Sequence, residues 1–392
     1  MNNQKKTAEM RFVDTPQALT ELCRELQPAE VIAVDTEFIR EKTYYAKLCL
    51  IQVASETVTA CIDPLALDNL DELLAILYSP NKLKLFHAAW QDLEIFYDQW
   101  DRIPAPIFDT QIASALLGFS DQIGYANLTE QLLHVELDKS AVRTDWAQRP
   151  LSSQQLAYAA DDVNYLLQLY PIILQRLTEL GRESWLEEDF SALTDPTAYA
   201  KSTDMAWQRV SGHGRLKPRQ LAALQRLASW REQQARQRNK PRKWILSDDI
   251  LLTLARQLPS DQTQLTKVRG LPERLLNQSG QEIIAAINDA LSLAEKALPT
   301  VLQKQRLTPE QECLADTLMA YLRLLGQQNQ ISPASLGTRK EIEKLARGKR
   351  DIPLLHGWRG HLVGNPLLDL INGKIALTVK DGEVITIVID DN

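Results

Sequence analysis

Three short apolar segments near the start of the chain limit most strongly what it can fold into. Val31–Phe38, Lys47–Ala54 and Thr57–Ile62 are rich in apolar and β-branched residues and lie only a few residues apart, which is the pattern of an antiparallel meander. Strand and helix patterns alternate behind them, with strands expected at Lys82–His87 and Pro106–Asp109 and helices at Leu70–Tyr78 and Asp92–Trp100. This succession predicts an α/β domain with a mixed sheet and helices on its faces.

The rest of the chain has mainly helical periodicity. Helices are expected at Thr110–Leu117, Asn127–Leu133 and Ser152–Leu180, the last of them interrupted at Pro171. A stretch rich in Thr, Ser and Pro around Asp195–Met205 predicts a linker. We therefore expect an α/β domain over residues 1–200, a helical domain over 205–295, and a second helical domain over 300–392 that ends in a β-hairpin turning at Lys380-Asp381-Gly382.

The distribution of charge separates the first half of the chain from the segment behind it. Residues 1–200 contain 15 Lys and Arg against 31 Asp and Glu, a net charge of −16, whereas residues 201–300 contain 17 against 9, a net charge of +8. Such an asymmetry favours a nucleic-acid partner. No apolar run approaches the roughly 18 residues of a membrane span, and residues 1–12 lack the apolar core of a signal peptide. We therefore expect a cytoplasmic protein without a membrane partner.

The strongest candidate for a functional site is Asp35-Thr36-Glu37, inside the first predicted strand. Alternation along a strand places Asp35 and Glu37 on the same side. Two carboxylates this close repel each other unless a cation neutralises them. By itself the pair is more typical of a solvent-facing strand end, because surface carboxylates are common.

Two further acidic positions follow in the chain. Asp92 comes after a predicted strand and near the start of a helix, where it could simply stabilise the helix N-terminus. Tyr158 and Asp162 are four residues apart in a predicted helix and therefore share a face, whereas Asp161 points away. Asp-x-Glu on a strand, Asp after a later strand and Tyr-x-x-x-Asp on a helix, in this order, form a set far more specific than any of its parts.

This set of motifs resembles the DEDD superfamily of exonucleases, in the branch whose last motif contains tyrosine, and within that branch the ribonuclease D family. The similar stretches are VDTEFIREKTYYAKLCL (34–50), LFHAAWQDLEIF (85–96), FDTQIASALL (108–117) and LAYAADDVNYLL (156–167). Ala206–Leu291 is similar to the HRDC domain and Thr308–Ile375 to a more divergent copy of it. The resemblance implies a ribonuclease-H-like α/β exonuclease domain, with a mixed sheet flanked by helices, followed by two all-α HRDC-like domains.

The resemblance also implies a 3′→5′ exoribonuclease that hydrolyses phosphodiester bonds at RNA 3′ ends, releases 5′-mononucleotides and processes transfer-RNA precursors. The family's metal-binding carboxylates fall on Asp35, Glu37, Asp92 and Asp162, and its tyrosine falls on Tyr158. Four carboxylates without histidine favour Mg²⁺ or Mn²⁺ over zinc, and two such ions would hold both oxygens of an in-line displacement. Tyr158 would orient the attacking water, because a phenol with a pKa of about 10 is a poor base at neutral pH.

Arg215–Lys243 is a candidate RNA-binding segment. It contains ten basic residues against one acid, with tryptophans interleaved, and such side chains suit phosphate contact and base stacking. Within it we expect Arg236, Arg238 and Lys240 to contact RNA, although a solvated helix face has a similar composition.

Other residues near the acidic motifs have two interpretations each. His87 could contact the substrate phosphate or pack at the end of a strand. Asp109 is expected to cap the helix that follows it. The aromatic side chains that could stack on bases are expected instead to pack in the core; these are Trp90, Tyr44 and Tyr45.

Two other functions remain open from the sequence. A 3′→5′ DNA exonuclease would use the same carboxylates, because RNA and DNA are distinguished by contacts to the 2′-hydroxyl. A non-catalytic RNA-binding scaffold would share the basic segment, but the complete set of carboxylates argues against it. A helicase is disfavoured because the sequence has no Gly-x-x-x-x-Gly-Lys-Ser/Thr phosphate loop. We also expect the protein to act without ATP and as a monomer.

Overall fold

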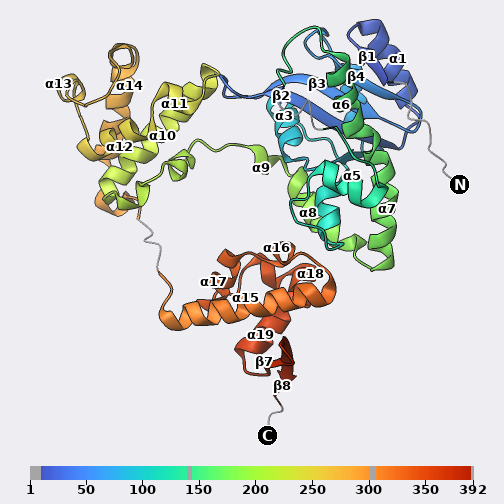
Figure 1. Cartoon of the computed structure of the whole chain (residues 1–392). Helices are drawn as coiled ribbons and strands as arrows, with labels where there is room; N and C mark the ends of the chain where they lie inside the picture. Colours follow the sequence, from blue (N-terminus) through green and yellow to red (C-terminus); the bar gives the residue numbers. More distant parts are fainter. Residues whose placement is uncertain (1–9, 139–143, 301–305, 390–392) are drawn as a thin grey trace, which may run out of the picture. The chain divides into compact units, whose positions relative to one another are not determined.

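The computed structural model describes residues 10–138, 144–300 and 306–389. Its contacts divide the chain into two compact units (Figure 1). Unit 1 combines residues 1–37, 48–196 and 306–392, and unit 2 combines residues 38–47 and 197–305. The units are not three consecutive segments, because the segment from 306 onward shares a core with the α/β part. The expected boundary at residue 300 adjoins residues 301–305, which lie outside the described residues.

Unit 1 is built on a six-stranded sheet. Its strands are β1 (Met10–Val13), β2 (Val31–Ile39, whose last two residues belong to unit 2), β3 (Lys47–Ala54), β4 (Thr59–Ile62), β5 (Leu83–Phe86) and β6 (Ile107–Asp109), in the order β1-β4-β3-β2-β5-β6. β3 and β4 are antiparallel, whereas β2, β5 and β6 run parallel. The predicted mixed sheet is confirmed, and each strand predicted for it is present.

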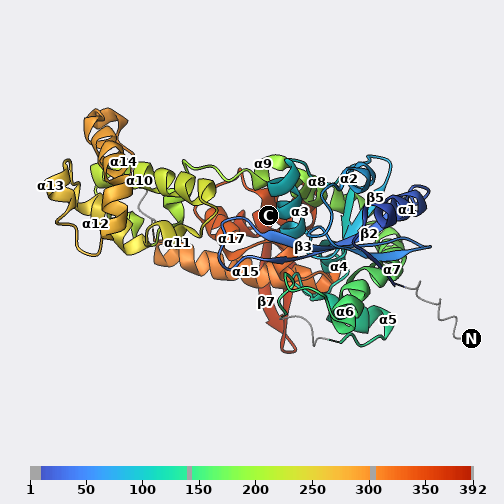
Figure 2. The same ribbon diagram turned by 90° about the horizontal axis from the view of Figure 1, so that it is seen from above.

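Helices cover both faces of this sheet. In Figure 2, α1 (Pro16–Leu26) and α2 (Asp71–Leu77) lie on one side of it and α5 (Tyr125–Leu133), α6 (Ser153–Asn164) and α7 (Leu166–Glu179) on the other. The other helices before residue 200 are α3 (Trp90–Trp100), α4 (Thr110–Ala115), α8 (Leu186–Thr194) and α9 (Pro196–Tyr199). Ala33, Leu85 and Phe108 of the sheet share one core with Leu169 and Ile173 of α7, which fixes the face on which α7 packs.

The helix expected from Ser152 to Leu180 is in fact two helices. The break lies at Tyr165, between α6 and α7, and Pro171 lies inside α7, so the prediction of an interruption at Pro171 is wrong. Proline lacks the N–H that would bond to the carbonyl of Leu167, four residues earlier. α7 tolerates this loss because its buried face, which includes Leu169 and Ile173, continues on both sides of the proline.

The C-terminal part of unit 1 is helical and ends in a hairpin. Its elements are α15 (Pro309–Asn329), α16 (Pro333–Leu336), α17 (Arg339–Ala346), α18 (Gly357–Arg359), α19 (Asn365–Ile371), β7 (Ile375–Lys380) and β8 (Glu383–Val388). Asp381 and Gly382 both have positive φ, 54° and 84°, as a two-residue hairpin turn of this kind requires. The predicted hairpin and its turn are therefore confirmed.

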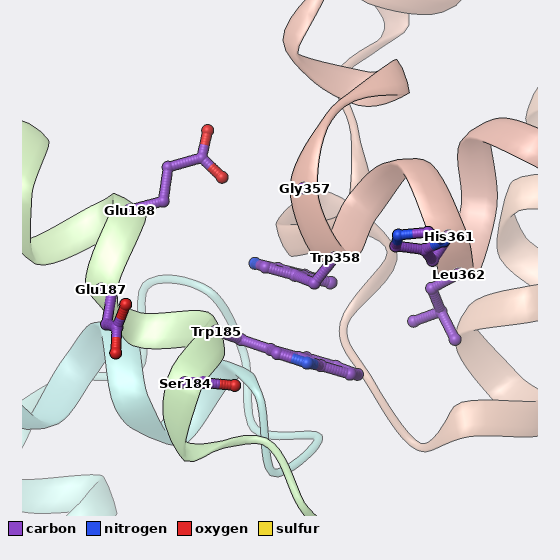
Figure 3. Close-up of a pocket in the computed structure, with 8 residues that line it drawn as sticks. All are labelled: Ser184, Trp185, Glu187, Glu188, Gly357, Trp358, His361 and Leu362. Carbon is purple, nitrogen blue, oxygen red and sulfur yellow. The ribbon is translucent and has the colours of Figure 1, made fainter.

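Two stacked tryptophans join this C-terminal part to the α/β part of unit 1. Trp185 lies in a 3-10 turn (Glu183–Trp185) before α8, and Trp358 lies in α18. Their ring centroids are 4.6 Å apart and their planes differ by 3°. Figure 3 shows the parallel rings in a pocket whose other lining residues include Glu187, Glu188 and His361.

Two arginines strengthen the same junction. Arg359, next to Trp358 in sequence, pairs with Asp189 of α8 at 3.1 Å. Arg182 donates hydrogen bonds of 2.6 Å to the carbonyls of Leu116 and Asn329, and so links α15 to the residue that follows α4. The segment after residue 306 is thus a structural part of unit 1.

Unit 2 is a bundle of helices. These are α10 (Pro218–Gln237), α11 (Arg242–Ile245), α12 (Asp248–Gln257), α13 (Gln262–Leu265) and α14 (Glu273–Ser292). α10 packs against α12 and α14 through a core that includes Leu224, Leu251 and Ile283. Among the described residues, no helix combines the length and apolar character that crossing a membrane would need.

Residues 38–47, which connect β2 to β3, pack into unit 2 around a buried carboxylate. Glu232 of α10 is 1% exposed; it accepts hydrogen bonds from the Tyr44 hydroxyl and from the guanidinium of Arg242. Asn239 accepts from the backbone N–H groups of Tyr44 and Tyr45. Burial opposes ionisation of Glu232, but the hydrogen bonds from Arg242 and Tyr44 outweigh it and hold the pKa of this carboxyl below its ordinary value.

Candidate active site

The first two carboxylates lie on the central strand of the sheet. Asp35 and Glu37 are half-buried and alternate with Thr36, which is buried, as the period of a strand requires. The register pairs Ala33 with Leu85 of β5, so Asp35 and Glu37 extend past the carboxyl end of β5. The two side chains therefore lie where the chain leaves the sheet and turns into α3.

That turn supplies the third carboxylate. Asp92 lies in the first turn of α3 and is 7% exposed. The Thr36 hydroxyl donates a hydrogen bond to the Asp92 carboxylate, which ties the start of α3 to β2. Sequence reasoning missed this role of Thr36, because the two residues are 56 positions apart and no local pattern connects them.

α6 supplies the fourth carboxylate and the tyrosine. Its N-terminus is fixed by a capping box in which the Ser152 hydroxyl accepts from the Gln155 N–H and the Gln155 side chain accepts from the Ser152 N–H. One turn further on, Tyr158 and Asp162 lie four residues apart in α6 and share a face, and burial, followed by the Asp162 charge, raises the pKa of Tyr158. The predicted i, i+4 pairing is therefore present in the structure.

The carboxylates from β2 and α6 converge on one point. Oxygen atoms of Asp35, Glu37 and Asp162 all lie within 4.8 Å of one another. Burial, and then the charge of Asp35, raise the pKa of Asp92, so the α3 carboxylate borders the same cluster. The structure thus brings Asp35, Glu37, Asp92, Asp162 and Tyr158 to one site.

Burial and mutual repulsion raise the pKa of each of the four carboxyl groups in the site. Burial raises the pKa of Asp35, with Asp162 adding to the effect. Burial raises the pKa of Asp162 to about 7, with Asp161 and Asp92 adding to it. Burial, and then the charges of Asp35, Asp162 and Asp92, raise the pKa of Glu37 to about 10. Hard divalent cations with oxygen ligands relieve such repulsion, so the donor set fits Mg²⁺ or Mn²⁺.

A half-buried arginine supports the entry to α6. Arg149 pairs with Asp63, the residue after β4, at 2.5 Å, and donates to the carbonyls of Cys49 and Trp146. The Trp146 ring lies 6.2 Å from that of Tyr158. No local sequence pattern signals this arrangement, because it depends on contacts between residues 86 and 100 positions apart.

His87 is placed as a structural residue at the end of β5. Its Nε2 donates to the carbonyl of Ile123 at 2.9 Å, and its Nδ1 lies 2.9 Å from the Thr110 hydroxyl. Burial lowers the pKa of His87, so the ring is neutral and both nitrogens are used within the protein. Of its two interpretations, the structure matches packing at a strand end.

The basic candidates of unit 2 fall into two groups. Arg236 donates to the carbonyl of Lys201 and to the Tyr44 hydroxyl, so its guanidinium serves the cluster around Glu232. Arg238 and Lys240 are exposed at the end of α10. The Lys240 ammonium lies 6.0 Å from the centre of the exposed Trp244 ring.

The three aromatic candidates differ in how far they are buried. Tyr44 is 7% exposed, which confirms the expectation that it packs in the core, and Tyr45 packs against the same core of unit 2. Trp90 at the start of α3 is 48% exposed, so the expectation of core packing is wrong for this residue. A helix N-terminus at the sheet edge leaves its first side chains outside the core, a position that periodicity alone does not reveal.

Comparisons with known proteins agree with this geometry. Residues 10–178 match a family model described as 3′-5′ exonuclease, and residues 220–287 match the HRDC domain. The chain is 39% identical to ribonuclease D of Sphingobium indicum, covering 95% of this chain and 97% of that one, and 36% identical to ribonuclease D of Bartonella henselae, covering 92% and 90%. The crystal structure of Escherichia coli RNase D matches with a TM-score of 0.82 and 31% identity, covering 93% of this chain and 99% of the other.

A mixed sheet flanked by helices, with carboxylates gathered at one edge and an HRDC domain later in the chain, defines the class of 3′-5′ exonucleases that carry an HRDC domain. Within that class, the chain belongs to the ribonuclease D family. It is a 3′-5′ exoribonuclease, a hydrolase that acts on RNA. The family resemblance and the fold expected from the sequence are confirmed.

Proposed function

We propose that this exoribonuclease trims the 3′ ends of transfer-RNA precursors and other structured RNAs, releasing 5′-mononucleotides with two divalent metal ions. The observation that carries the proposal is the convergence of Asp35, Glu37 and Asp162 within 4.8 Å, with Asp92 at its border. The Escherichia coli relative is described as an exoribonuclease involved in structured RNA processing, which supports the proposed substrate class.

Asp35, Glu37, Asp92 and Asp162 would hold the ions as Mg²⁺ or Mn²⁺, with Asp35 the best placed to contact both because its charge acts on Glu37 and Asp92 alike. Such ions, when bound, stabilise the charge that develops on the attacking and leaving oxygens of an in-line displacement. The protein's own contribution is to fix the carboxylates on a strand and two helices, where packing limits their movement.

Tyr158 would orient the attacking water. Burial raises the pKa of Tyr158, and the Asp162 charge adds to the effect, so the phenol keeps its proton throughout the neutral range. A protonated phenol can donate one hydrogen bond and still has oxygen lone pairs available to accept from a water molecule. This assigns Tyr158 a positioning role at the reacting atoms and not proton abstraction.

The RNA strand would be held in part by unit 2. Arg238 and Lys240 are exposed just after α10 ends, within the segment of net positive charge, and phosphate contacts position RNA without reading its sequence. We also propose that Thr308–Ile375 is a second, divergent HRDC-like domain, and that the enzyme acts as a monomer without ATP.

The test is degradation of a 3′-labelled transfer-RNA precursor, with and without divalent metal, beside DNA of the same sequence. We expect stepwise release of labelled 5′-mononucleotide from RNA with Mg²⁺ or Mn²⁺, no release with EDTA, and slower attack on DNA. Metal-independent release would contradict the assignment of the carboxylates. Equal rates on RNA and DNA would contradict the proposed selectivity for RNA.

A further inference from the structure

One buried carboxylate connects the starts of two helices beside the active site. Asp109, the last residue of β6, is 1% exposed. Its Oδ1 accepts from the backbone N–H groups of Gln111 at 2.8 Å and Ile112 at 3.3 Å, which is the cap of α4 that the sequence predicts. The same Oδ1 also accepts from the N–H of Ala88 at 3.1 Å, and Oδ2 accepts from the N–H of Ala89 at 2.8 Å.

These last two bonds reach the residues that begin α3. Ala89 is the N-cap position of α3, and no side chain of its own segment caps it. Free N–H groups at the start of a helix need acceptors, and Asp109 supplies one from a neighbouring strand. The register, which pairs Phe86 with Asp109, places the carboxylate directly beside the turn.

The turn that Asp109 holds has an unfavourable backbone conformation. Ala88 has a φ of 58°, in the left-handed region where a side chain other than glycine or asparagine is disfavoured. Such a conformation persists only where its surroundings enforce it. The two hydrogen bonds that Asp109 accepts from the N–H groups of Ala88 and Ala89 stabilise this conformation.

The turn also sets the position of Asp92. Leu93 closes the first turn of α3 through a 2.9 Å hydrogen bond to the Ala89 carbonyl, so the direction of α3, and with it Asp92, depends on the conformation at Ala88 and Ala89. Ligands one ångström out of place lose much of their effect on a reaction.

We propose that Asp109 is a positioning residue for Asp92: by holding the Ala88–Ala89 turn, it fixes the α3 carboxylate relative to the strand that carries Asp35. Asp109 touches neither substrate nor the reacting atoms in this role. The proposal rests on the proposed function of Asp92 as a metal ligand.

Asp109→Asn separates this role from the capping of α4. The amide oxygen can replace Oδ1, which accepts three of the four hydrogen bonds, and the amide nitrogen then faces the N–H of Ala89, where it cannot accept. We expect the variant to fold and to bind Mn²⁺ on the order of 10-fold more weakly by calorimetry, with kcat on a short RNA reduced on the order of 10- to 100-fold. The KM for that RNA should change little. Wild-type metal affinity and kcat in Asp109→Asn would overturn the proposal.

Ala88→Gly provides the second arm. Glycine adopts a positive φ without a steric penalty, so in the Asp109→Asn background it should restore part of the lost Mn²⁺ affinity and kcat. A defect that Ala88→Gly leaves unchanged would show that Asp109 does not act through this turn. Asp261→Asn is the matched control, because Asp261 caps α13 of unit 2 through the Gln264 N–H and should leave both quantities unaltered.

Asp92→Asn distinguishes failure of this proposal from failure of the proposed function. If Asp92→Asn keeps full metal affinity and activity, the assignment of Asp92 as a ligand is wrong, whatever Asp109 does. If Asp92→Asn abolishes activity and Asp109→Asn has no effect, the ligand assignment stands and the positioning role is overturned.

Discussion

The raised pKa of a buried active-site carboxyl makes the stability of the metal-free protein depend on pH. Burial raises the pKa of Asp162 to about 7, well above the value near 3.9 of an unfolded chain. The folded state therefore retains a proton that the unfolded state releases between about pH 4 and pH 7, so the stability contributed by this group falls as the pH rises through that window.

Asp162→Asn should abolish hydrolysis and stabilise the metal-free protein at pH 8, because the amide removes one of the repelling charges. We expect a gain of about 1–3 kcal/mol in the free energy of unfolding, measured by denaturant titration in EDTA, and almost no gain at pH 4. Asp35→Asn should behave alike. More than a few per cent of wild-type activity in both variants would rule out these carboxylates as ligands.

Tyr158→Phe removes only the phenolic hydroxyl. We expect kcat to fall on the order of 100-fold, because a misplaced nucleophile reacts slowly, while the Kd for RNA changes by less than about threefold. Single-turnover rates and RNA binding measured separately provide the check. Weakened RNA binding with unchanged kcat would instead identify Tyr158 as a substrate contact.

The residues of the site could be predicted from the sequence because each pair is local. Asp35 and Glu37 share a strand face through a period of two, and Tyr158 and Asp162 share a helix face through a period close to four. Thr36 and the second function of Asp109 could not be predicted. They act on α3, whose position is set by packing between elements far apart in the chain.

At the scale of elements, the C-terminal end of α10 is the place to test RNA holding. Arg238→Gln with Lys240→Gln should flatten the slope of log K against log salt by up to about 1.4, since each phosphate contact on a single strand contributes about 0.7. Cleavage of a saturating short oligonucleotide should not change.

Arg236 is left intact because it holds the Glu232 cluster. Lys340→Gln with Lys349→Gln alters charge equally at exposed positions of unit 1 and should have a smaller effect. Equal slopes for both pairs would mean that α10 makes no special contact.

The sequence patterns missed the first two elements of the described chain. The strand β1 and the helix α1 were not expected, although Thr15 at the N-cap and Pro16 at the first position of α1 are typical start signals. β1 has only four residues at the edge of the sheet, where its pairing with β4 determines that it is a strand. The helix break predicted at Pro171 was wrong because the packing of α7 outweighed the strong local tendency of proline to interrupt a helix.

At the scale of the whole molecule, the C-terminal part of unit 1 should unfold together with the α/β part. Trp358→Ala removes the stacked ring and should destabilise unit 1 by about 3–5 kcal/mol, the usual effect of truncating a buried aromatic side chain. Trp244→Ala is the control: Trp244 is 60% exposed and should cost less than about 0.5 kcal/mol. Urea unfolding followed by circular dichroism measures both. An unchanged midpoint for Trp358→Ala would show that the stack does not stabilise the junction.

Because the chain passes between the two units more than once, neither unit can be removed or exchanged as a single block. The chain leaves unit 1 after Glu37, contributes Tyr44 to the core of unit 2, and returns at residue 48 before it enters unit 2 again after residue 196. Neither unit consists of one continuous stretch of the chain. Recombination that exchanged residues 197–305 as one block would separate Glu232 from Tyr44 and leave a buried carboxylate short of a hydrogen-bond donor. Variants of unit 2 therefore need matching changes in residues 38–47, which follow β2.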